Sequence, residues 1–437
     1  MIAELARFLE ITRRRHWPPQ RIRALQERRL HALVAQCYEH VPLYRRRLDA
    51  AGIRPDAIRT LEDLQKIPIT RKPDYFPIED ALDHRPDQIT HRIERTSGSS
   101  GNRMCIPVSR EQHILRGAVF FRGRLDVGAG MFDRSLTVGH LDVPFRPRLQ
   151  ALCNPRVRLN SHCTLEDGLA TFRSFRPHNL AGLPTQIQLF ADRVREAGAT
   201  DVRPRRVLLG GETLSSPARA YIEETFHAPV RMFYGSWEFG FVACECREGK
   251  GYHLISDHIL VECLQDGEPV AAGEPGEIVM TALVPNVMPF LRYGIRDIGV
   301  LIPRAECACR LPGPVIASIR GRENDLLTLA DGRRVGPFFP SDATKNLTQV
   351  RSCRLIQETL THFRLEYAAD SELSEQVLQS IRKWYADNML AERIEIFRVQ
   401  EIPPDPSGKL RRVVSHVNQP AGQSGDAGDR EKTEGAE

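Results

Sequence analysis

A run of hydroxyl-bearing residues and glycines near position 100 is the part of this sequence best suited to chemistry. It comprises Thr96, Ser97, Gly98, Ser99, Ser100 and Gly101. Glycines let the backbone turn so that successive N–H groups point into one concavity, and the hydroxyls add donors for phosphate oxygens. No Gly-Lys-Ser/Thr follows, so this is not a Walker A sequence. The loop suits a nucleoside triphosphate; taken alone, it also fits a plain flexible turn.

A lysine near the C-terminus stands in a turn that could carry a cation to a ligand. Lys409 follows Pro406-Ser407-Gly408, and only seven of the 61 basic residues are lysines. Lysine is a compact, mobile charge that can neutralise a phosphate or carboxylate in a transition state. Its rarity here favours a functional lysine over a basic surface turn.

Three further clusters each follow an apolar run that reads as a strand. The first is Gly210-Gly211-Glu212, a glycine turn. The second, Tyr234-Gly235-Ser236-Trp237-Glu238, offers an aromatic face for a purine and a carboxylate for Mg²⁺, which prefers oxygen ligands. The third ends at Asp297, whose carboxylate could accept hydrogen bonds from both ribose hydroxyls. Such turns are common singly, so it is their combination that indicates a nucleotide site.

The elements that must position these residues form two predicted domains. Residues 1–320 read as a large N-terminal α/β domain, beginning with a helical segment over about residues 1–70. Residues 321–417 read as a small α+β domain that carries Lys409. Residues 418–437 contain almost no large apolar side chain, which predicts a disordered tail.

Local patterns predict several of these elements individually. Residues 206–211 read as a buried strand that ends in a glycine turn, and residues 216–226 as the helix that follows. In the small domain, Asp331-Gly332 predicts the turn of a hairpin, and residues 372–388 predict an amphipathic helix.

The composition is that of an ordinary globular protein. The 437 residues are 41% hydrophobic and 27% charged, and 61 basic against 56 acidic residues give a net charge of +5. This balance argues against nucleic acid as the main partner. No apolar run approaches the roughly 18 residues of a membrane span, and Arg7 and Glu10 interrupt the stretch that a signal peptide would keep apolar. Ten scattered cysteines predict reduced thiols and a cytoplasmic protein.

The order of the motifs resembles the adenylate-forming superfamily, and most closely its phenylacetate–CoA ligase-like branch. The hydroxyl and glycine loop, Gly-Gly-Glu, Tyr-Gly-x-x-Glu, Arg-Tyr-x-x-Arg-Asp, Gly-Arg-x-x-Asp and Ser-Gly-Lys follow one another along the chain. The likeness covers about residues 38–415 and includes Leu183-Pro184-Thr185. It implies a large N-terminal α/β domain with a small mobile α+β C-terminal domain.

The resemblance implies that the protein activates a small carboxylic acid with ATP and Mg²⁺. The carboxylate would attack the α-phosphorus of ATP to give an acyl-adenylate and pyrophosphate. A thiol, usually that of coenzyme A, would then displace AMP. Between the two steps the C-terminal domain would rotate, so that Lys409 leaves and the thiol enters.

The resemblance also assigns roles to individual residues. Those expected to bind the nucleotide are Thr96, Ser97, Gly98, Ser99, Ser100 and Gly101 at the β- and γ-phosphates, Gly210, Gly211, Glu212, Tyr234 and Gly235 around the adenine, Asp297 at the ribose, and Arg322 just before the hinge. Glu238 is expected to bind Mg²⁺. Lys409 is expected to bridge the carboxylate and the α-phosphate during adenylation.

The sequence departs from the pattern of the branch at three places. Asn102-Arg103 stands where relatives often have Lys-Pro, and Trp237 stands where Ser or Thr usually precedes the glutamate. The stretch 139–145 replaces an aromatic and glycine-rich run near the acyl pocket. His140 and Trp237 are therefore the expected acid-pocket residues, and phenylacetate is not carried over as the substrate.

A set of cysteines and one histidine resembles the structural zinc site that some members of this branch carry. Cys246, His253, Cys307 and Cys309 are the best match, with Cys244 as a spare or substitute. Four thiolate and imidazole ligands satisfy tetrahedral zinc. The alternative is a group of small buried residues beside a surface histidine.

Two alternatives to a coenzyme A ligase stay open at this point. The acyl group could pass to a carrier-protein thiol or to an amine, because no coenzyme A site is recognisable. The chain could also be a non-catalytic accessory protein that keeps the fold; Trp237 motivates this reading, while Lys409, Glu238 and Asp297 together argue against it. Members of the branch are often dimers, so a homodimer is a further expectation.

Overall fold

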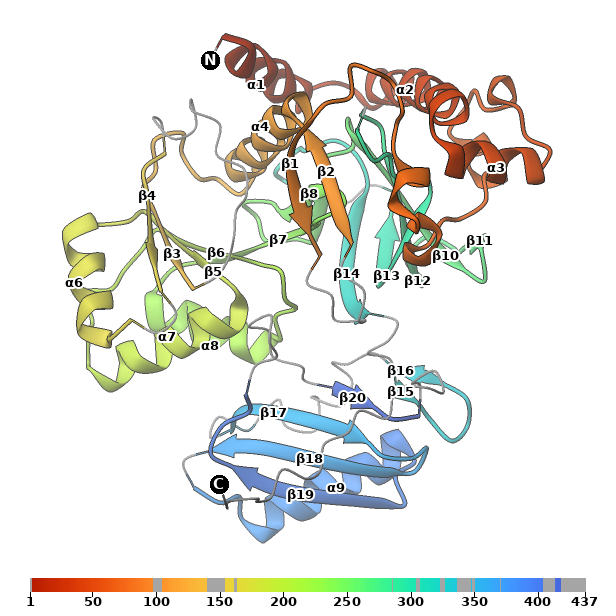
Figure 1. Ribbon diagram of the computed structural model, residues 1–437. Helices are drawn as coiled ribbons and strands as arrows, with labels where there is room; N and C mark the ends of the chain where they lie inside the picture. Colours follow the sequence, from red (N-terminus) through yellow and green to blue (C-terminus); the bar gives the residue numbers. More distant parts are fainter. Residues whose placement is uncertain are drawn as a thin grey trace, which may run out of the picture. The chain divides into compact units, whose positions relative to one another are not determined.

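The computed structural model describes residues 2–96, 104–139, 154–160, 163–284, 286–303, 307–322, 327–335, 347, 350–369, 371–403 and 413–417. These residues divide into two compact units, one holding the described residues up to 322 and the other those from 327 on. The first is a large mixed α/β unit and the second a smaller α+β unit, as predicted (Figure 1). The predicted tail over 418–437 lies outside the described residues.

The larger unit is built on a twelve-stranded sheet of order β11-β10-β12-β13-β14-β9-β8-β7-β6-β5-β3-β4. Its parallel half consists of β3 (Ser135–Val138), β4 (Arg156–Leu159), β5 (Asn179–Gly182), β6 (Arg206–Gly210) and β7 (Val230–Ser236). The helices α6 (Leu165–Phe175), α7 (Pro184–Glu196) and α8 (Ser216–Phe226) connect these strands. Helix α8 begins at its N-cap Ser215, whose hydroxyl accepts a hydrogen bond from the amide of Ala218.

The other half of the sheet is antiparallel. It consists of β8 (Gly240–Glu245), β9 (Tyr252–Leu254), β10 (Ile259–Gln265), β11 (Glu268–Pro269), β12 (Pro275–Ala282), β13 (Tyr293–Ile302) and β14 (Val315–Arg322). Strand β14 pairs with β13 on one side and with β9 on the other, which joins the last segment of the unit to its middle.

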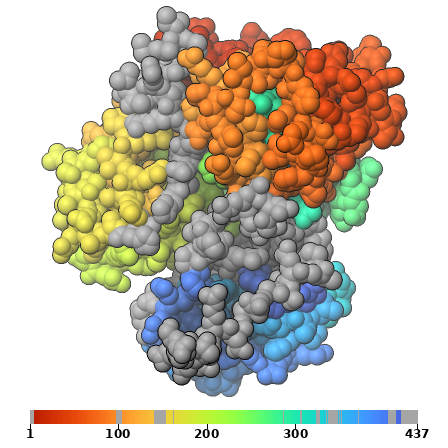
Figure 2. All heavy atoms as spheres, viewed as in Figure 1, coloured from red at the N-terminus to blue at the C-terminus, as the bar shows by residue number. Residues whose placement is uncertain are grey.

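A two-stranded ribbon and a long helix lie beside this sheet. Strands β1 (Thr90–Arg95) and β2 (Cys105–Ser109) pair antiparallel, and α4 (Arg110–Asp126) follows at once from its N-cap Ser109. Residues of this part of the chain, drawn in orange, form much of the visible upper surface in Figure 2.

The N-terminal segment is helical over a shorter range than predicted. Helices α1 (Ile2–Arg14), α2 (Pro19–His40) and α3 (Pro42–Ala50) are followed only by short 3₁₀ turns, among them η1 (Pro55–Ala57) and η2 (Glu62–Lys66). The helical expectation to residue 70 is therefore wrong beyond Ala50. Proline explains the difference, because Pro55, Pro68, Pro73 and Pro77 each remove a backbone donor and restrict the preceding residue. Among the described helices, none is both long and apolar enough to cross a membrane.

The smaller unit is a four-stranded sheet of order β19-β18-β17-β20 with one helix packed on it. Its elements are β17 (Val350–Gln357), β18 (His362–Ala369), α9 (Glu375–Met389), β19 (Arg393–Val399) and β20 (Val413–Ser415), together with the hairpin β15 (Leu327–Thr328) and β16 (Arg334–Val335). Ile381 and Tyr385 of α9 are buried against Phe363 and Leu365 of β18.

Candidate active site and metal cluster

The carboxyl ends of two parallel strands carry five of the thirteen predicted nucleotide residues. Strand β6 ends at Gly210, so that Gly211 and Glu212 follow it, and the adjacent parallel strand β7 carries Tyr234 and Gly235 near its own end. In open α/β sheets ligands bind at this edge, because the loops after parallel strands meet there. Gly210 and Tyr234 are 24 positions apart in the chain (234 minus 210). The sheet therefore brings these two predicted motifs to one edge.

Two positions of these motifs require glycine, one because of close backbone approach and the other because of its backbone conformation. A Cβ on Gly235 would lie 2.2 Å from the carbonyl oxygen of Gly240. Gly211 has a φ of +81°, a left-handed conformation that side chains disfavour. The turns after β6 and β7 therefore need glycine at these positions to keep their shape.

Glu212 is hydrogen-bonded to the segment that follows the neighbouring strand, β5. Its Oε2 accepts hydrogen bonds from the amide of Thr185 at 3.0 Å and from the Thr185 hydroxyl at 2.8 Å. Thr185 follows β5, the strand next to β6. This link explains why the Leu183-Pro184-Thr185 motif and the Gly-Gly-Glu motif occur together.

Tyr234 and Asp297 lie in contact although they belong to separate motifs. The Tyr234 hydroxyl donates a hydrogen bond to Oδ2 of Asp297 at 2.8 Å. In the antiparallel pair β13–β14, the register places Asp297 opposite Arg322. The residues predicted for the adenine, the ribose and the nucleotide beside the hinge thus lie on β7, β13 and β14, with Asp297 linked both to Tyr234 and to the register position of Arg322.

Glu238 lies in the turn between β7 and β8 and is mostly buried. The Tyr293 hydroxyl donates to Oε1 of Glu238 at 3.5 Å, and burial raises the pKa of Tyr293, which therefore stays protonated as a donor. The Ser236 hydroxyl accepts a hydrogen bond from the amide of Phe239 and closes the turn. Trp237 is half-buried and packs against the large core of this unit.

The base of the hydroxyl and glycine loop is closed by Thr96. The amide of Thr96 donates to the carbonyl of Met104 at 3.1 Å, and the amide of Met104 donates to the Thr96 hydroxyl at 3.0 Å. The residues between them, including Ser97, Gly98, Ser99, Ser100 and Gly101, lie outside the described part of the chain, as do His140 and Lys409. For Arg322 only the backbone is described.

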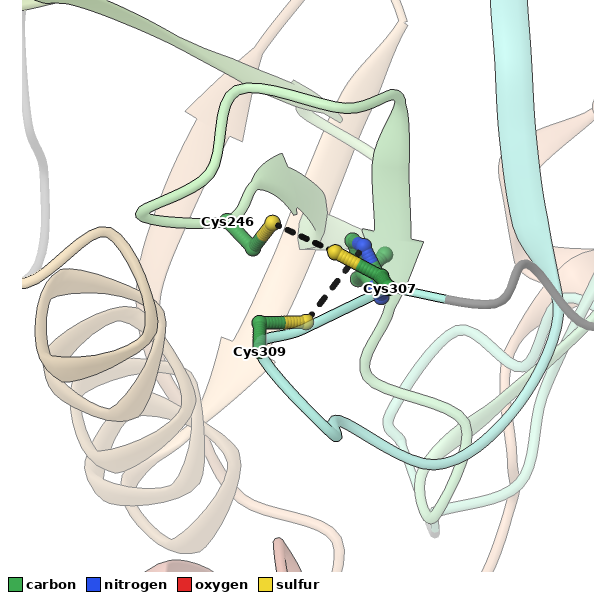
Figure 3. Close-up of side chains that lie close together, drawn as sticks. Cys246, Cys307 and Cys309 are labelled. Carbon is green, nitrogen blue, oxygen red and sulfur yellow. Dashed lines mark hydrogen bonds between the residues drawn. The ribbon is translucent and has the colours of Figure 1, made fainter.

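The four predicted zinc ligands form one cluster. Each offers one ligand atom, and these atoms all lie within 4.8 Å of one another. Figure 3 shows Cys246, Cys307 and Cys309 converging, with Sγ of Cys246 3.5 Å from Sγ of Cys307 and Sγ of Cys309 3.8 Å from Nε2 of His253. Such spacings match the edges of a tetrahedron with Zn–S bonds of about 2.3 Å.

The sheet explains this convergence. His253 lies in β9, between β8, which ends one residue before Cys246, and β14, which the chain enters soon after Cys309. Burial opposes ionisation of the Cys246 thiol, but hydrogen bonds from His253 and backbone amides outweigh it and lower its pKa to about 6. Cys244 donates instead to the carbonyl of Gly123 at 3.7 Å and takes no part in the cluster.

Comparison with known proteins decides the family. No family model matches the chain. A phenylacetate-coenzyme A ligase of Thermus thermophilus is 30% identical over 380 residues, which cover 83% of this chain and 82% of that protein. A phenylacetate-coenzyme A ligase of Escherichia coli is 28% identical over 364 residues, 79% of each. The chain belongs to the phenylacetate–coenzyme A ligase family.

Solved structures agree on the fold of this ligase. A 2-hydroxyisobutyryl-CoA ligase in the postadenylation state, in complex with 2-HIB-AMP, superposes with a TM-score of 0.79 at 19% identity, covering 92% of this chain and 91% of that one. An anthranilate CoA ligase in complex with anthranoyl-AMP gives a TM-score of 0.58 at 16% identity, covering 76% and 67%. The predicted adenylate-forming fold is confirmed.

The predicted activity is confirmed as well. The ligase is an AMP-forming acid–thiol ligase, which activates a small carboxylic acid as its adenylate and transfers the acyl group to coenzyme A. ATP and coenzyme A are its co-substrates.

Sequence reasoning missed one side chain of this site. Arg116 of α4 contacts the backbone of both Trp237 and Glu238 and also pairs with Glu94 of β1. Neither Glu94 nor Arg116 belongs to any of the motifs singled out in the sequence. No local pattern marks a residue whose partners are main-chain atoms more than a hundred positions away.

Proposed function

We propose that this ligase binds Mg²⁺·ATP along the carboxyl edge of its sheet and adenylates an acid there. The observation that supports this most directly is the contact between Tyr234 and Asp297, with Arg322 in register beside Asp297. It brings an aromatic ring, which can stack on adenine, and a carboxylate, which can accept hydrogen bonds from ribose hydroxyls, to the edge where α/β sheets bind nucleotides.

In this proposal the other predicted residues bind the phosphates, the adenine and the metal ion of Mg²⁺·ATP. The loop Thr96–Gly101 holds the β- and γ-phosphates through its N–H groups and hydroxyls. Gly210, Gly211 and Glu212 lie along the adenine, and Tyr234 and Gly235 lie against the face of the adenine ring. Mg²⁺, a hard cation that prefers carboxylate oxygen, is held by Glu238.

Lys409 neutralises the carboxylate and the α-phosphate as the acyl–phosphate bond forms. The attacking carboxylate and the α-phosphate both carry negative charge, so a mobile ammonium between them lowers the barrier. We place the boundary of the domain that carries it at 320/321. Rotation of residues 321–417 then withdraws Lys409 and admits the thiol.

His140 and Trp237 line the acid pocket in this proposal. The named relatives act on phenylacetate. Trp237, which replaces a small hydroxyl residue of the branch pattern, narrows the pocket beside Glu238. We therefore propose an acid whose shape differs from that of phenylacetate.

The four-residue cluster holds a structural Zn²⁺ in this proposal. Three thiolates and one imidazole form a closed ligand set with no position left for substrate, which is typical of structural zinc. Thiolate ligands stay reduced in the cytoplasm, where we place the protein. A homodimer stays a prediction, which sedimentation velocity would test.

ATP–pyrophosphate exchange tests the proposal. The purified ligase is assayed with aryl, heteroaryl and short aliphatic acids, in the presence and absence of coenzyme A and of Mg²⁺. Acid-dependent exchange that needs Mg²⁺ supports it, and thioester formation with coenzyme A identifies the acceptor. Exchange that needs no divalent cation would overturn the role of Glu238, and exchange with coenzyme A left unacylated would point to a carrier protein.

A further inference from the structure

A buried ion pair lies directly behind the turn that carries Glu238. Arg116 is 5% exposed and Glu94 is 2% exposed. Nη1 of Arg116 donates to Oε2 of Glu94 at 2.5 Å, and this pair joins α4 to β1. Burying two charges is costly, and a buried pair seldom adds net stability over apolar side chains of similar size. A role other than stability is therefore to be sought for it.

The same guanidinium also holds the backbone of the Glu238 turn. Nη1 of Arg116 donates to the carbonyl of Trp237 at 3.1 Å, and Nη2 donates to the carbonyl of Glu238 at 2.7 Å. Gly240, at the end of the turn, has a φ of +70°, and a Cβ there would lie 3.2 Å from Cδ of Arg116. The arginine is thus clamped between consecutive carbonyls on one side and a carboxylate on the other.

This arrangement connects two parts of the proposed Mg²⁺·ATP site. Glu94 lies in β1, which ends at Arg95, one residue before Thr96, and Thr96 closes the base of the phosphate loop through Met104. On its other side Arg116 fixes the peptide units that flank the side chain of Glu238. Only a planar guanidinium, which has several N–H donors in fixed positions, can bind the Glu94 carboxylate and the two carbonyl groups of the turn at once.

We propose that Arg116 is a positioning residue that holds the Glu238 turn at a fixed place relative to the base of the phosphate loop, so that the Glu238 carboxylate would be able to hold Mg²⁺ without rearrangement of the turn. Groups behind a metal ligand orient it, and their loss weakens metal binding without removing a ligand. The inference rests on the proposed roles of Glu238 and of the loop that begins at Thr96.

Arg116→Lys separates positioning from folding. A lysine at this position keeps a positive charge for Glu94, but its single ammonium cannot also reach both carbonyls with fork geometry. Arg122→Lys is the matched control. Arg122 lies on the same helix, is 4% exposed and pairs with Asp257 at 2.7 Å, but its described partners lie outside the Glu238 turn and the phosphate loop.

The affinities for Mg²⁺·ATP and for ATP in the presence of EDTA are measured by isothermal titration calorimetry on the intact chain, without any acid. Arg116→Lys is expected to weaken Mg²⁺·ATP binding about tenfold, the lower end of the effect of removing a group behind a metal ligand. Its affinity for metal-free ATP should stay within about twofold, because the loop is untouched. Arg122→Lys should change neither value, although both variants lose stability.

The outcomes are distinguishable. The Mg²⁺ preference is the ratio of the affinity for Mg²⁺·ATP to the affinity for metal-free ATP. If this ratio is the same in Arg116→Lys as in Arg122→Lys, the inference is overturned. If Arg116→Lys fails to fold, Glu94→Gln decides: it removes the charge behind Arg116, and an unchanged Mg²⁺ preference would overturn the inference in the same way. Glu238→Gln is run in parallel, and a full Mg²⁺ preference in that variant would reject the proposed metal ligand itself.

Discussion

The hydroxyl of Tyr234 donates a hydrogen bond to the carboxylate of Asp297, and this bond links β7 to β13 across the middle of the sheet. The strands between them in the sheet are β8, β9 and β14. An aromatic ring proposed for the adenine is thereby fixed to the carboxylate proposed for the ribose. The two halves of a nucleoside site therefore have a set separation before any ligand arrives.

Asp297→Ala should raise the KM for ATP in pyrophosphate exchange by roughly ten- to a hundredfold, since a charged hydrogen-bond partner is worth about 1.5–3 kcal/mol. Tyr234→Phe keeps the ring and removes only the hydroxyl, so a rise of a few-fold is expected from a loss of about 1 kcal/mol. Initial rates at varied ATP and saturating acid measure both. An unchanged KM for ATP in Asp297→Ala would show that the ribose lies elsewhere.

Lys409→Ala should separate the two half-reactions. Adenylation should fall by about a thousandfold or more, because the ammonium acts on charge in the transition state. Thioester formation from supplied acyl-adenylate should change little. Lys383→Ala removes an exposed lysine of α9 and serves as the control. Equal damage to both half-reactions by Lys409→Ala would contradict the rotation of the C-terminal domain.

Zinc should be present at one ion per chain in protein purified without chelator. Cys309→Ser should lower that ratio and the Tm, because binding of structural zinc contributes directly to folding. Cys244→Ser removes the neighbouring thiol, which bonds to Gly123 instead, and should retain the full zinc ratio. Elemental analysis and thermal unfolding give the answer, and zinc-free wild-type protein with an unaltered Tm would refute the site.

Acidification should destabilise the larger unit through His258. Burial lowers the pKa of His258 to about 4, and its Nε2 lies 3.1 Å from the carbonyl of Phe241. The unfolded chain takes up this proton near pH 6.5, before the folded one does, so the stabilising contribution is complete above pH 6.5 and is lost as the pH falls toward 4. Between pH 7.5 and 5.5 the loss is about 1 kcal/mol.

Urea unfolding at the two pH values tests this. His258→Gln keeps an amide donor for Phe241 and cannot titrate, so its free energy of unfolding should fall by about 1 kcal/mol less than that of the wild type. Identical pH dependence in the two proteins would show that the pKa of His258 is the same in the folded and unfolded states.

Local patterns predicted the elements that depend on nearby residues. The apolar run before Gly210 becomes β6, the segment from Ser216 becomes α8 over its predicted range, and Asp331-Gly332 becomes a turn with Gly332 at a φ of +83°. In each case propensity, capping or glycine chemistry and the packing agree. The helical expectation was wrong after Ala50 because prolines such as Pro55 and Pro68 exclude a continuous helix there.

The motif order assigned residues to a site, and that assignment stays a prediction; it did not predict how these residues contact one another. The contact of Glu212 with Thr185 and that of Tyr234 with Asp297 depend on the order of strands in the sheet, which no local pattern encodes. Arg116 was missed for the same reason, because its partners are backbone carbonyls brought near by β7 and β8. Spacing along the chain is a poor guide to such pairs.

The insertion of β14 between β13 and β9 has a consequence for synthesis on the ribosome. The parallel strands β3 to β7 are complete once residue 236 has emerged, and they can collapse on their own helices. Strand β9 gains its second neighbour only after residues 315–322 are translated, and Asp297 meets its register partner at the same moment. Contacts between distant segments form late. A nascent chain therefore brings together the residues of the proposed nucleoside site only when nearly three quarters of it has been made, about 322 of 437 residues, and a product terminated earlier lacks β14, the strand that carries Arg322 opposite Asp297.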